Sequence, residues 1–266
     1  MGEIEAEAAP ADTLRQALAR RLRGLMGAMG AALDIVYPPA CAGCGVLLGS
    51  AASLCPHCWG RLALIERPYC EVLGTPFSHD LGLGILSADA IANPPPFDRL
   101  RSVALYDDLA RGLVHALKYR DRTELAPMMA GWMLRAGDGV VQAADVIVPV
   151  PLHRFRLIWR KFNQSAELAR AIGALAAKPV LIDAVRRTKR TRRQIGLAPR
   201  AREENVRGAF AITPEGREAL FGRRVVLVDD VYTTGATVAA VTRTLKRAGA
   251  ADVTVLTFAR ALPGPI

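Results

Sequence analysis

The sequence predicts an α/β fold with a mostly parallel sheet flanked by helices. Three observations lead to this prediction. Apolar runs rich in valine, at 146–151 and 225–228, are typical of strands that are buried on both faces. Segments with apolar residues at helical spacing lie between such runs. The chain has 266 residues, which is enough for one α/β core and one small additional module.

The composition is that of a globular protein with a basic character. Hydrophobic residues make up 51% of the chain and the formal net charge is +10. This charge favours nucleic acid or phosphate-rich substrates as partners, although an arginine-rich composition alone is weak support for either. No segment approaches the ~18 apolar residues of a membrane-spanning helix. We therefore expect a cytoplasmic protein without a transmembrane segment.

Residues 1–35 are expected to form a disordered tail followed by an amphipathic helix. The first twelve residues are acidic and rich in alanine, and leucines then recur near helical spacing with arginines between them. A helix that packs on the body of the protein is the favoured interpretation, and docking on a membrane surface is the alternative. The segment imitates a signal peptide, but glycines and Asp34 interrupt its apolar run.

Residues 36–75 are predicted to form a zinc-ribbon module. Two C-x-x-C pairs lie here, and two such pairs can close a tetrahedral site of four thiolates around one structural Zn²⁺. The expected ligands are Cys41, Cys44, Cys55 and Cys58. A disulfide pair or a vestigial motif is the alternative. Cys70 stands alone and is predicted to be a packed or free thiol.

Residues 76–266 are predicted to form the α/β domain. Strands are expected at 102–106, 146–151, 208–212, 225–228 and 253–258, with helices at 109–117 and 125–134, a third ending near Leu175, and a fourth after Thr237. Parallel strands joined by helices place ligand sites at the carboxyl ends of the strands. Arg186–Arg202 holds eight basic residues and no acid.

The segment Arg224–Thr237, RVVLVDDVYTTGAT, combines a buried strand, two acids and a threonine-rich turn before a helix. Backbone N–H groups at a helix start attract phosphate, and Gly235 lets the backbone close around it. The adjacent carboxylates of Asp229 and Asp230 need hydroxyl donors or a hydrated Mg²⁺ to offset their repulsion. Together these groups predict a ribose 5-phosphate site. An ordinary strand–turn–helix with solvated acids is the alternative.

This stretch resembles the phosphoribosyl-pyrophosphate (PRPP) signature of type I phosphoribosyltransferases, and not a P-loop, because the lysine after the glycine is missing. The resemblance implies a type I phosphoribosyltransferase-like fold that binds PRPP with Mg²⁺. The implied binding residues are Asp229, Asp230, Thr233, Thr234, Gly235, Ala236 and Thr237. Lys118 is placed like the pyrophosphate-loop lysine of such enzymes, and the alternative is a lysine that snorkels at a helix end.

The order of motifs resembles the ComF family, phosphoribosyltransferase-like proteins tied to bacterial DNA uptake. These motifs are the cysteine module, LKYRDR at 117–122, VPVPLH and FNQ within 148–164, and the PRPP signature. ComF relatives usually carry a second C-x-x-C pair. Here Cys70 fills the first position of that pair but Leu73 fills the second, so a second complete zinc site is doubtful. Lys161 also replaces a glycine of the family pattern.

Two functions are consistent with these residues. The first is a PRPP-dependent phosphoribosyltransferase, which transfers a pentosyl group, with Arg186–Arg202 as a basic lid; its catalytic residues and acceptor are not identifiable, and His153 is the nearest candidate base. The second is a non-catalytic accessory that binds single-stranded DNA, works with the DNA-uptake machinery and retains the PRPP fold. The sequence does not decide between them.

Overall fold

The computed structural model describes residues 38–49, 53–80, 82–119, 122–152, 162–189 and 205–262. The chain divides into two compact units, Met1–Ser53 and Leu54–Ile266. The predicted tail and amphipathic helix, His153, Lys161 and most of the basic run lie outside the described residues. Among the described helices, none is both long and apolar enough to cross a membrane. The domain boundaries predicted from the sequence stay a prediction.

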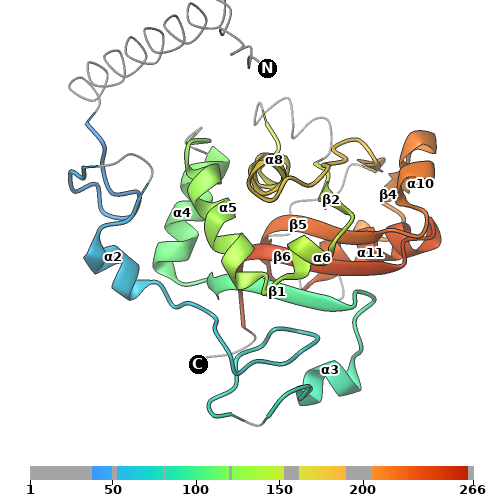
Figure 1. The fold of residues 1–266 in the computed structure, drawn as a ribbon, viewed down its shortest axis with the longest axis horizontal. Coiled ribbons are helices and arrows are strands. Elements are labelled where there is room, and N and C mark those ends of the chain that lie inside the picture. Colours follow the sequence, from blue (N-terminus) through green and yellow to red (C-terminus); the bar gives the residue numbers. More distant parts are fainter. Residues whose placement is uncertain are drawn as a thin grey trace, which may run out of the picture. The chain divides into compact units, whose positions relative to one another are not determined.

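The larger unit is built on a four-stranded parallel sheet with strand order β1-β6-β5-β2 (Figure 1). The strands are β1 (Arg99–Leu105), β2 (Val146–Pro149), β5 (Arg224–Tyr232) and β6 (Asp252–Arg260). Every neighbouring pair in this sheet is parallel. Val225–Val228 are buried, as expected for a central strand covered on both faces. The predicted α/β fold with a mostly parallel sheet is confirmed.

A short antiparallel pair lies apart from this sheet. It consists of β3 (Val185–Arg187) and β4 (Phe210–Ile212). The sequence predicts β4 within 208–212, but it does not predict β3, which is only three residues long and lies at the start of the basic run. In the sequence, β3 therefore lies at the start of the basic run and β4 follows the run.

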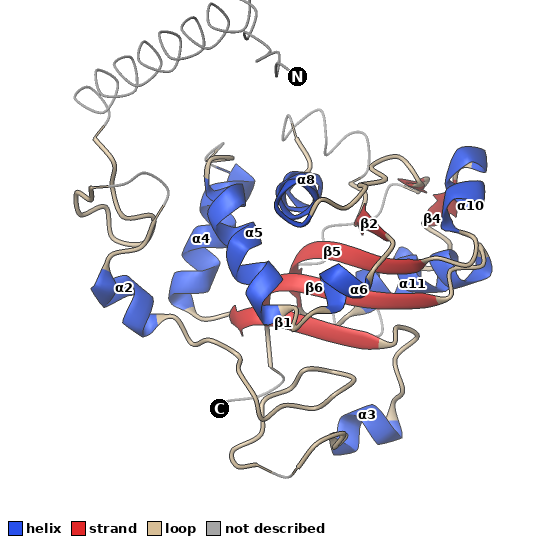
Figure 2. Cartoon of the chain, viewed as in Figure 1, coloured by secondary structure: helices blue, strands red, loops and turns tan. Residues whose placement is uncertain are grey.

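Helices cover the sheet, and α4, α5 and α8 lie on one side of it in Figure 2. The described helices are α2 (Pro56–Arg61), α3 (Ala88–Ala92), α4 (Asp108–Tyr119), α5 (Leu125–Ala136), α6 (Val140–Ala143), α8 (Gln164–Ala176), α10 (Pro214–Leu220) and α11 (Ala236–Arg247). The long helices match their predicted ranges closely. The sequence does not predict α3, α6 and α10, because helices of five, four and seven residues are too short to show a helical period.

The apolar stripe of α4 shows why these segments are helical. Ala110, Leu113, Val114 and Leu117 follow the i, i+3, i+4, i+7 pattern and all four are buried. Lys118 follows directly on Leu117, near the end of the helix. The amphipathic pattern therefore fixes where the side chain of Lys118 leaves α4.

The strand β1 is at one edge of the sheet, and the segment 63–72 covers that edge. The N–H of Ile65 donates to the carbonyl of Val103 at 2.8 Å, and the N–H of Leu105 donates to Ala63 at 2.8 Å. Farther along, the N–H of Leu100 donates to Val72 at 2.8 Å. These bonds satisfy backbone groups that an open edge would leave to solvent or to another chain.

The strand β5 is longer than the sequence predicts. We expected a strand at 225–228 that the two acids would end, but β5 continues through both of them to Tyr232. Its backbone stays paired with β6, with Asp229 opposite Thr257 and Tyr232 opposite Arg260. Carboxylates do not end a strand when the neighbouring strand continues the ladder, so the acids lie within the last part of β5.

Candidate functional site

The acid pair near the carboxyl end of β5 is the centre of the candidate site. The Asp230 residue is only 4% exposed, and its Oδ2 lies 2.5 Å from Nζ of Lys118, which is itself largely buried. Among the described residues, no group donates a hydrogen bond to this oxygen beyond the ion pair. The structure therefore brings Lys118 to the acids and leaves capacity at Asp230 for a further donor. Its contact with pyrophosphate stays a prediction.

The neighbouring acid, Asp229, is held differently. Its Oδ1 accepts hydrogen bonds from the hydroxyl of Ser165 at 2.8 Å and from the N–H of Asp230 at 2.9 Å. Burial, and then the charge of Asp230, raise the pKa of Asp229 to about 7. Burial alone would lower the pKa of Lys118, but the charge and the hydrogen bond of Asp230, together with the charge of Asp229, outweigh burial and raise that pKa. The site therefore holds an ion pair beside a carboxyl that burial makes easier to protonate.

The start of helix α8 positions Ser165, and the sequence analysis missed this residue. The Oδ1 of Asn163 accepts the N–H of Ser165 at 3.1 Å and so caps the helix. The Nδ2 of Asn163 donates to the carbonyl of Val150 at 3.1 Å, which ties the helix start to the end of β2. Asparagine before a helical pattern is an N-cap signal, so the position of Ser165 in the first turn was readable from the sequence. Its contact with Asp229 was not.

The turn that follows β5 is shaped by Gly235. This residue has φ of 74° in the left-handed region and stands at the N-cap of α11. A Cβ here would lie 2.5 Å from the hydroxyl oxygen of Tyr232. The N-cap Gly235 has no side chain that could cap α11, and N–H groups at a helix start are groups that a bound anion can satisfy.

Tyr232 and Arg260 support this turn, and neither was singled out from the sequence. The guanidinium carbon of Arg260 lies 5.5 Å from the centroid of the Tyr232 ring, and Arg260 is 4% exposed. Arg260 also donates from Nη1 to the carbonyl of Leu73. The ring of Tyr232 also meets Phe97 edge to face at 6.2 Å. The residue that precedes the threonine turn is therefore fixed by contacts from distant segments.

A cavity of about 710 Å³ lies between the segment after β2, helix α8 and strand β3. Its lining mixes apolar groups with both charges: Pro151, Leu152, Phe162, Asn163, Ala166, Glu167, Arg170, Ile182, Asp183, Val185, Arg186, Arg187 and Thr188. Neither the acids nor the threonine turn is part of this lining. Asn163 connects the two places, because it lines the cavity and caps the helix that holds Ser165.

The four cysteines of the predicted zinc site lie together. Their sulfur atoms are all within 4.8 Å of one another. A tetrahedral zinc with Zn–S distances of about 2.3 Å needs sulfur atoms about 3.8 Å apart, so this donor set fits the ion. The N–H of Gly43 donates to Sγ of Cys41 and the N–H of Cys58 donates to Sγ of Cys55, both at 3.4 Å. Cys70 is fully buried and is not part of this cluster.

One zinc per chain is the expected metal content, because one complete set of four thiolates is present among the described residues. Elemental analysis of the purified protein measures it. Cys55→Ser should remove the metal and loosen the cysteine module. The α/β domain should stay folded, as measured by circular dichroism, because the sheet has its own apolar core. The matched control is Cys70→Ala, which should leave the zinc content unchanged. Two zinc ions in the natural protein, or none, would contradict the prediction.

Comparison with known proteins finds two family matches and several relatives. Residues 32–90 match the double zinc ribbon domain, and residues 165–264 match the phosphoribosyl transferase domain. DNA utilization protein YhgH of Escherichia coli K12 is 34% identical over 215 residues, which is 79% of this chain and 91% of that protein. Competence protein F of Haemophilus influenzae is 26% identical over 222 residues, which is 78% of this chain and 96% of that protein.

Solved structures also match in part. Glutamine PRPP amidotransferase from B. subtilis, complexed with ADP and GMP, is 25% identical over 49% of this chain, with a TM-score of 0.32; the match spans 25% of that enzyme chain. Purine phosphoribosyltransferase from Pyrococcus horikoshii is 19% identical over 51% of this chain and 73% of that one, with a TM-score of 0.31. A zinc ribbon, a phosphoribosyl transferase domain and 34% identity to YhgH over most of both chains show that this chain belongs to the ComF family.

Proposed function

We propose that the chain binds PRPP, or another ribose 5-phosphate compound, together with Mg²⁺. The observation that carries the proposal is the buried Asp230, whose Oδ2 is paired with Lys118 and has no further donor among the described residues, at the strand end that leads into a helix whose N-cap, Gly235, has no capping side chain. Vicinal ribose hydroxyls supply donors for the carboxylates, and a 5-phosphate supplies the anion for the helix start. One ligand then satisfies both demands.

Each residue has a distinct role in this proposal. Asp229 and Asp230 accept from the ribose hydroxyls, with Ser165 holding Asp229 in place. The turn from Thr233 to Thr237 wraps the 5-phosphate with hydroxyl and N–H donors. A bound Mg²⁺ would neutralise the diphosphate and assist its departure.

Lys118 changes partner in this proposal. In the ligand-free chain its ammonium group is paired with Asp230. Once ribose hydroxyls donate to Asp230, the ammonium group is released toward the diphosphate. Binding of the sugar and binding of the diphosphate are then coupled through one side chain.

The proposed reaction class is phosphoribosyl transfer. As diphosphate leaves, positive charge develops at C1 of the ribose, and the chain must hold both parts of the substrate in place while it excludes water. The acceptor is not defined by the described residues. We place the activity in the cytoplasm, because paired cysteines that bind a metal and form no disulfides are typical of a reducing compartment. The names of YhgH and competence protein F suggest a role in DNA uptake or in the use of its nucleotides.

Calorimetry with PRPP and Mg²⁺ tests the proposal. We expect heat of binding and a thermal shift, and Asp229→Asn with Asp230→Asn should weaken binding by about 1.5–3 kcal/mol for each charge-assisted hydrogen bond removed. The matched control is Glu215→Gln, an exposed acid in the first turn of α10, which should bind like the natural protein. Ribose 5-phosphate alone separates the sugar site from the diphosphate site. If millimolar PRPP with Mg²⁺ gave neither heat of binding nor a thermal shift, the proposal would be wrong, and the chain would share only the fold of phosphoribosyltransferases.

The alternative function is a non-catalytic accessory that binds single-stranded DNA. Arg186 and Lys189, both exposed, stand at the start of the basic run, and the names of the relatives refer to DNA use and competence. The formal charge of +10 is consistent with it. A basic lid over a diphosphate explains the same residues, so binding experiments must separate the two.

Salt dependence distinguishes these possibilities. Charge reversal at Arg190, Arg192 and Arg193, which lie outside the described residues, should flatten the salt dependence of single-stranded DNA binding by about 0.7 in the log–log slope for each phosphate that the protein ceases to neutralise. Reversal at the exposed Arg217 and Arg223 is the control and should leave the slope unchanged. Filter binding at several salt concentrations, with and without PRPP, measures the slope. An unchanged slope in the first variant would exclude this run as the DNA site.

A further inference from the structure

Residues 68–77 fold like residues 39–48, the first cysteine knuckle, which contains Cys41 and Cys44. The second segment contains only one cysteine, Cys70. In the first knuckle, Cys41 N–H donates to the carbonyl of Val46 at 2.7 Å; in the second, Cys70 N–H donates to Thr75 at 2.8 Å. The residue before each cysteine also forms an antiparallel bridge with the residue six positions after that cysteine. The second segment therefore has the backbone of a metal-binding knuckle.

The turns of the two knuckles agree as well. The N–H of Gly45 donates to the carbonyl of Cys41 at 2.9 Å, and the N–H of Gly74 donates to Cys70 at 2.7 Å. Both glycines have positive φ, 78° and 60°. A proline stands two residues before each cysteine, and its carbonyl accepts an N–H from the seventh residue after that cysteine. The sequences read P-x-C-x-x-C-G and P-x-C-x-x-L-G, so Leu73 occupies the position of Cys44.

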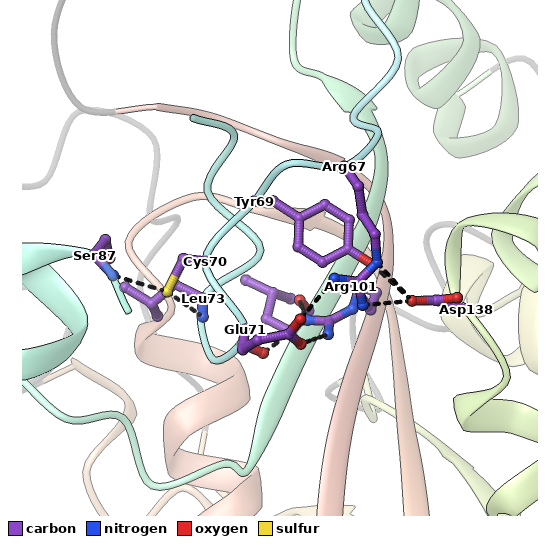
Figure 3. Close-up of polar contacts among 9 residues, drawn as sticks. Arg67, Tyr69, Cys70, Glu71, Leu73, Ser87, Arg101 and Asp138 are labelled. Atoms are coloured by element: carbon purple, nitrogen blue, oxygen red, sulfur yellow. Dashed lines mark hydrogen bonds and ion pairs between the residues drawn. The ribbon is translucent and has the colours of Figure 1, made fainter. Parts of the chain in front are cut away.

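The partner of the second knuckle is the start of helix α3. Cys55 is the N-cap of α2 with φ −69° and ψ 159°, and its sulfur accepts the N–H of Cys58. Ser87 is the N-cap of α3 with φ −70° and ψ 154°, and its hydroxyl accepts the N–H of Ala90. Ser87 thus corresponds to Cys55, and Ala90 to Cys58. The two halves meet at one atom, because the N–H of Ser87 donates to Sγ of Cys70 at 3.2 Å (Figure 3).

We propose that residues 68–90 are a second zinc ribbon from which the metal has been lost, with its four ligand positions occupied by Cys70, Leu73, Ser87 and Ala90. The double zinc ribbon match, which extends over residues 32–90, implies a second zinc ion. These residues do not fit one: leucine and alanine have no donor atom, and a single thiol with a hydroxyl cannot complete a tetrahedral site. The disagreement between the family match and the donor set is specific to this half of the module.

Apolar packing takes the place of the metal. Cys70 is fully buried, Leu73 and Ala90 are each 5% exposed, and all three belong to the apolar core that also includes Phe97 and Leu100. In a zinc-bound ribbon the metal holds the knuckles together, whereas here buried side chains that continue into the sheet do so. The second ribbon is therefore part of the core of the α/β domain.

Polar contacts fix the outer face of the second ribbon. The guanidinium groups of Arg67 and Arg101 lie on the ring of Tyr69, with their carbons 4.8 and 4.6 Å from its centroid. Both arginines pair with the carboxylate of Glu71 at 2.7 Å, and Arg67 also pairs with Asp138 at 2.8 Å (Figure 3). Since Arg101 belongs to β1, this cluster ties the ribbon to the sheet edge.

The second ribbon supports the threonine turn at 233–237 through protein contacts that do not need a metal. The carbonyl of Leu73 accepts from Arg260, whose guanidinium group lies against Tyr232, the residue before the threonine turn. A Cβ on Gly74 would lie 2.5 Å from the carbonyl oxygen of Leu100, so the knuckle is seated directly on β1. A support built in this way keeps the turn in place whatever the zinc concentration.

Restoring the ligands tests the proposal. The variant Leu73→Cys/Ser87→Cys/Ala90→Cys should carry about two zinc ions per chain where the natural protein carries about one. Cobalt substitution should show twice the absorbance of tetrahedral thiolate-bound cobalt. The matched control adds Cys70→Ser to the same three changes, and should lower the affinity of the second site or abolish it. A folded triple variant that still binds one zinc would overturn the proposal.

A second measurement needs no substitution. After a chelator removes zinc from the natural protein, the amides of Cys41, Gly45 and Leu48 should lose protection from hydrogen exchange, because their knuckle depends on the metal. The corresponding amides of the second knuckle should keep it; these belong to Cys70, Gly74 and Phe77. Loss of protection in both knuckles together would mean that the second ribbon also depends on a metal, and would overturn the proposal even if the triple variant does not fold.

Discussion

Replacing Lys118 by methionine is expected to lower the free energy of unfolding of the α/β domain by about 3–5 kcal/mol at neutral pH. Methionine keeps most of the length and apolar surface of the lysine stem, so the change removes the charge with little loss of packing. Asp230, which is 4% exposed, would be left as a buried carboxylate beside Asp229 with no cation against it. Urea denaturation followed by circular dichroism measures the loss.

Three comparisons separate this ion pair from ordinary surface charge. Arg170→Met breaks an exposed ion pair with Glu167 at 2.6 Å, and should cost less than about 1 kcal/mol. Lys118→Met with Asp230→Leu should recover part of the lost stability, because no buried charge remains. The effect of Lys118→Met should shrink toward pH 5, since a carboxyl without its cation is protonated more easily. A loss below about 1 kcal/mol at about pH 7.5 would contradict a desolvated pair.

The acid pair and the four cysteines could be predicted from the sequence because their chemistry lies within short segments. Asp229 and Asp230 lie in the last part of one strand and Gly235 follows it closely, and each C-x-x-C pair is a short segment by itself. Such patterns depend only on residues that are close to one another along the chain. The length of β5 was predicted wrongly for the same reason: the two charges suggested an end, whereas pairing with β6, a distant segment, continues the strand to Tyr232.

The contacts that hold the site together could not be predicted, because they join residues far apart in the sequence. Ser165 meets Asp229, and Arg260 joins Leu73 to Tyr232. The single Cys70 illustrates the limit most clearly. The sequence shows that Leu73 stands where the P-x-C-x-x-C-G pattern of the first knuckle has Cys44. The equivalence of Ser87 with Cys55 depends instead on helix-cap geometry that serine and alanine do not reveal by themselves.

The largest effect on ligand binding is expected from Gly235→Val. Valine is strained at the observed φ of 74°, and its Cβ would come within 2.5 Å of the Tyr232 hydroxyl oxygen. The turn must then shift or Tyr232 must leave its contacts with Arg260 and Phe97. Either movement displaces the N–H groups at the start of α11, so the affinity for PRPP should fall by at least about 100-fold, which corresponds to the removal of two charged hydrogen bonds.

Two further variants identify the cause of that weaker binding. Gly131→Val, in α5, has open space around its Cβ and an ordinary backbone conformation, so it should bind PRPP as the natural protein does. Gly235→Val with Tyr232→Ala removes the collision but leaves the backbone strain, and should recover only part of the affinity. Calorimetry and denaturation on the same samples separate affinity from folding. If Gly235→Val is folded and binds PRPP with undiminished affinity, the phosphate does not bind at this turn, and the site for ribose 5-phosphate must be sought elsewhere on the domain.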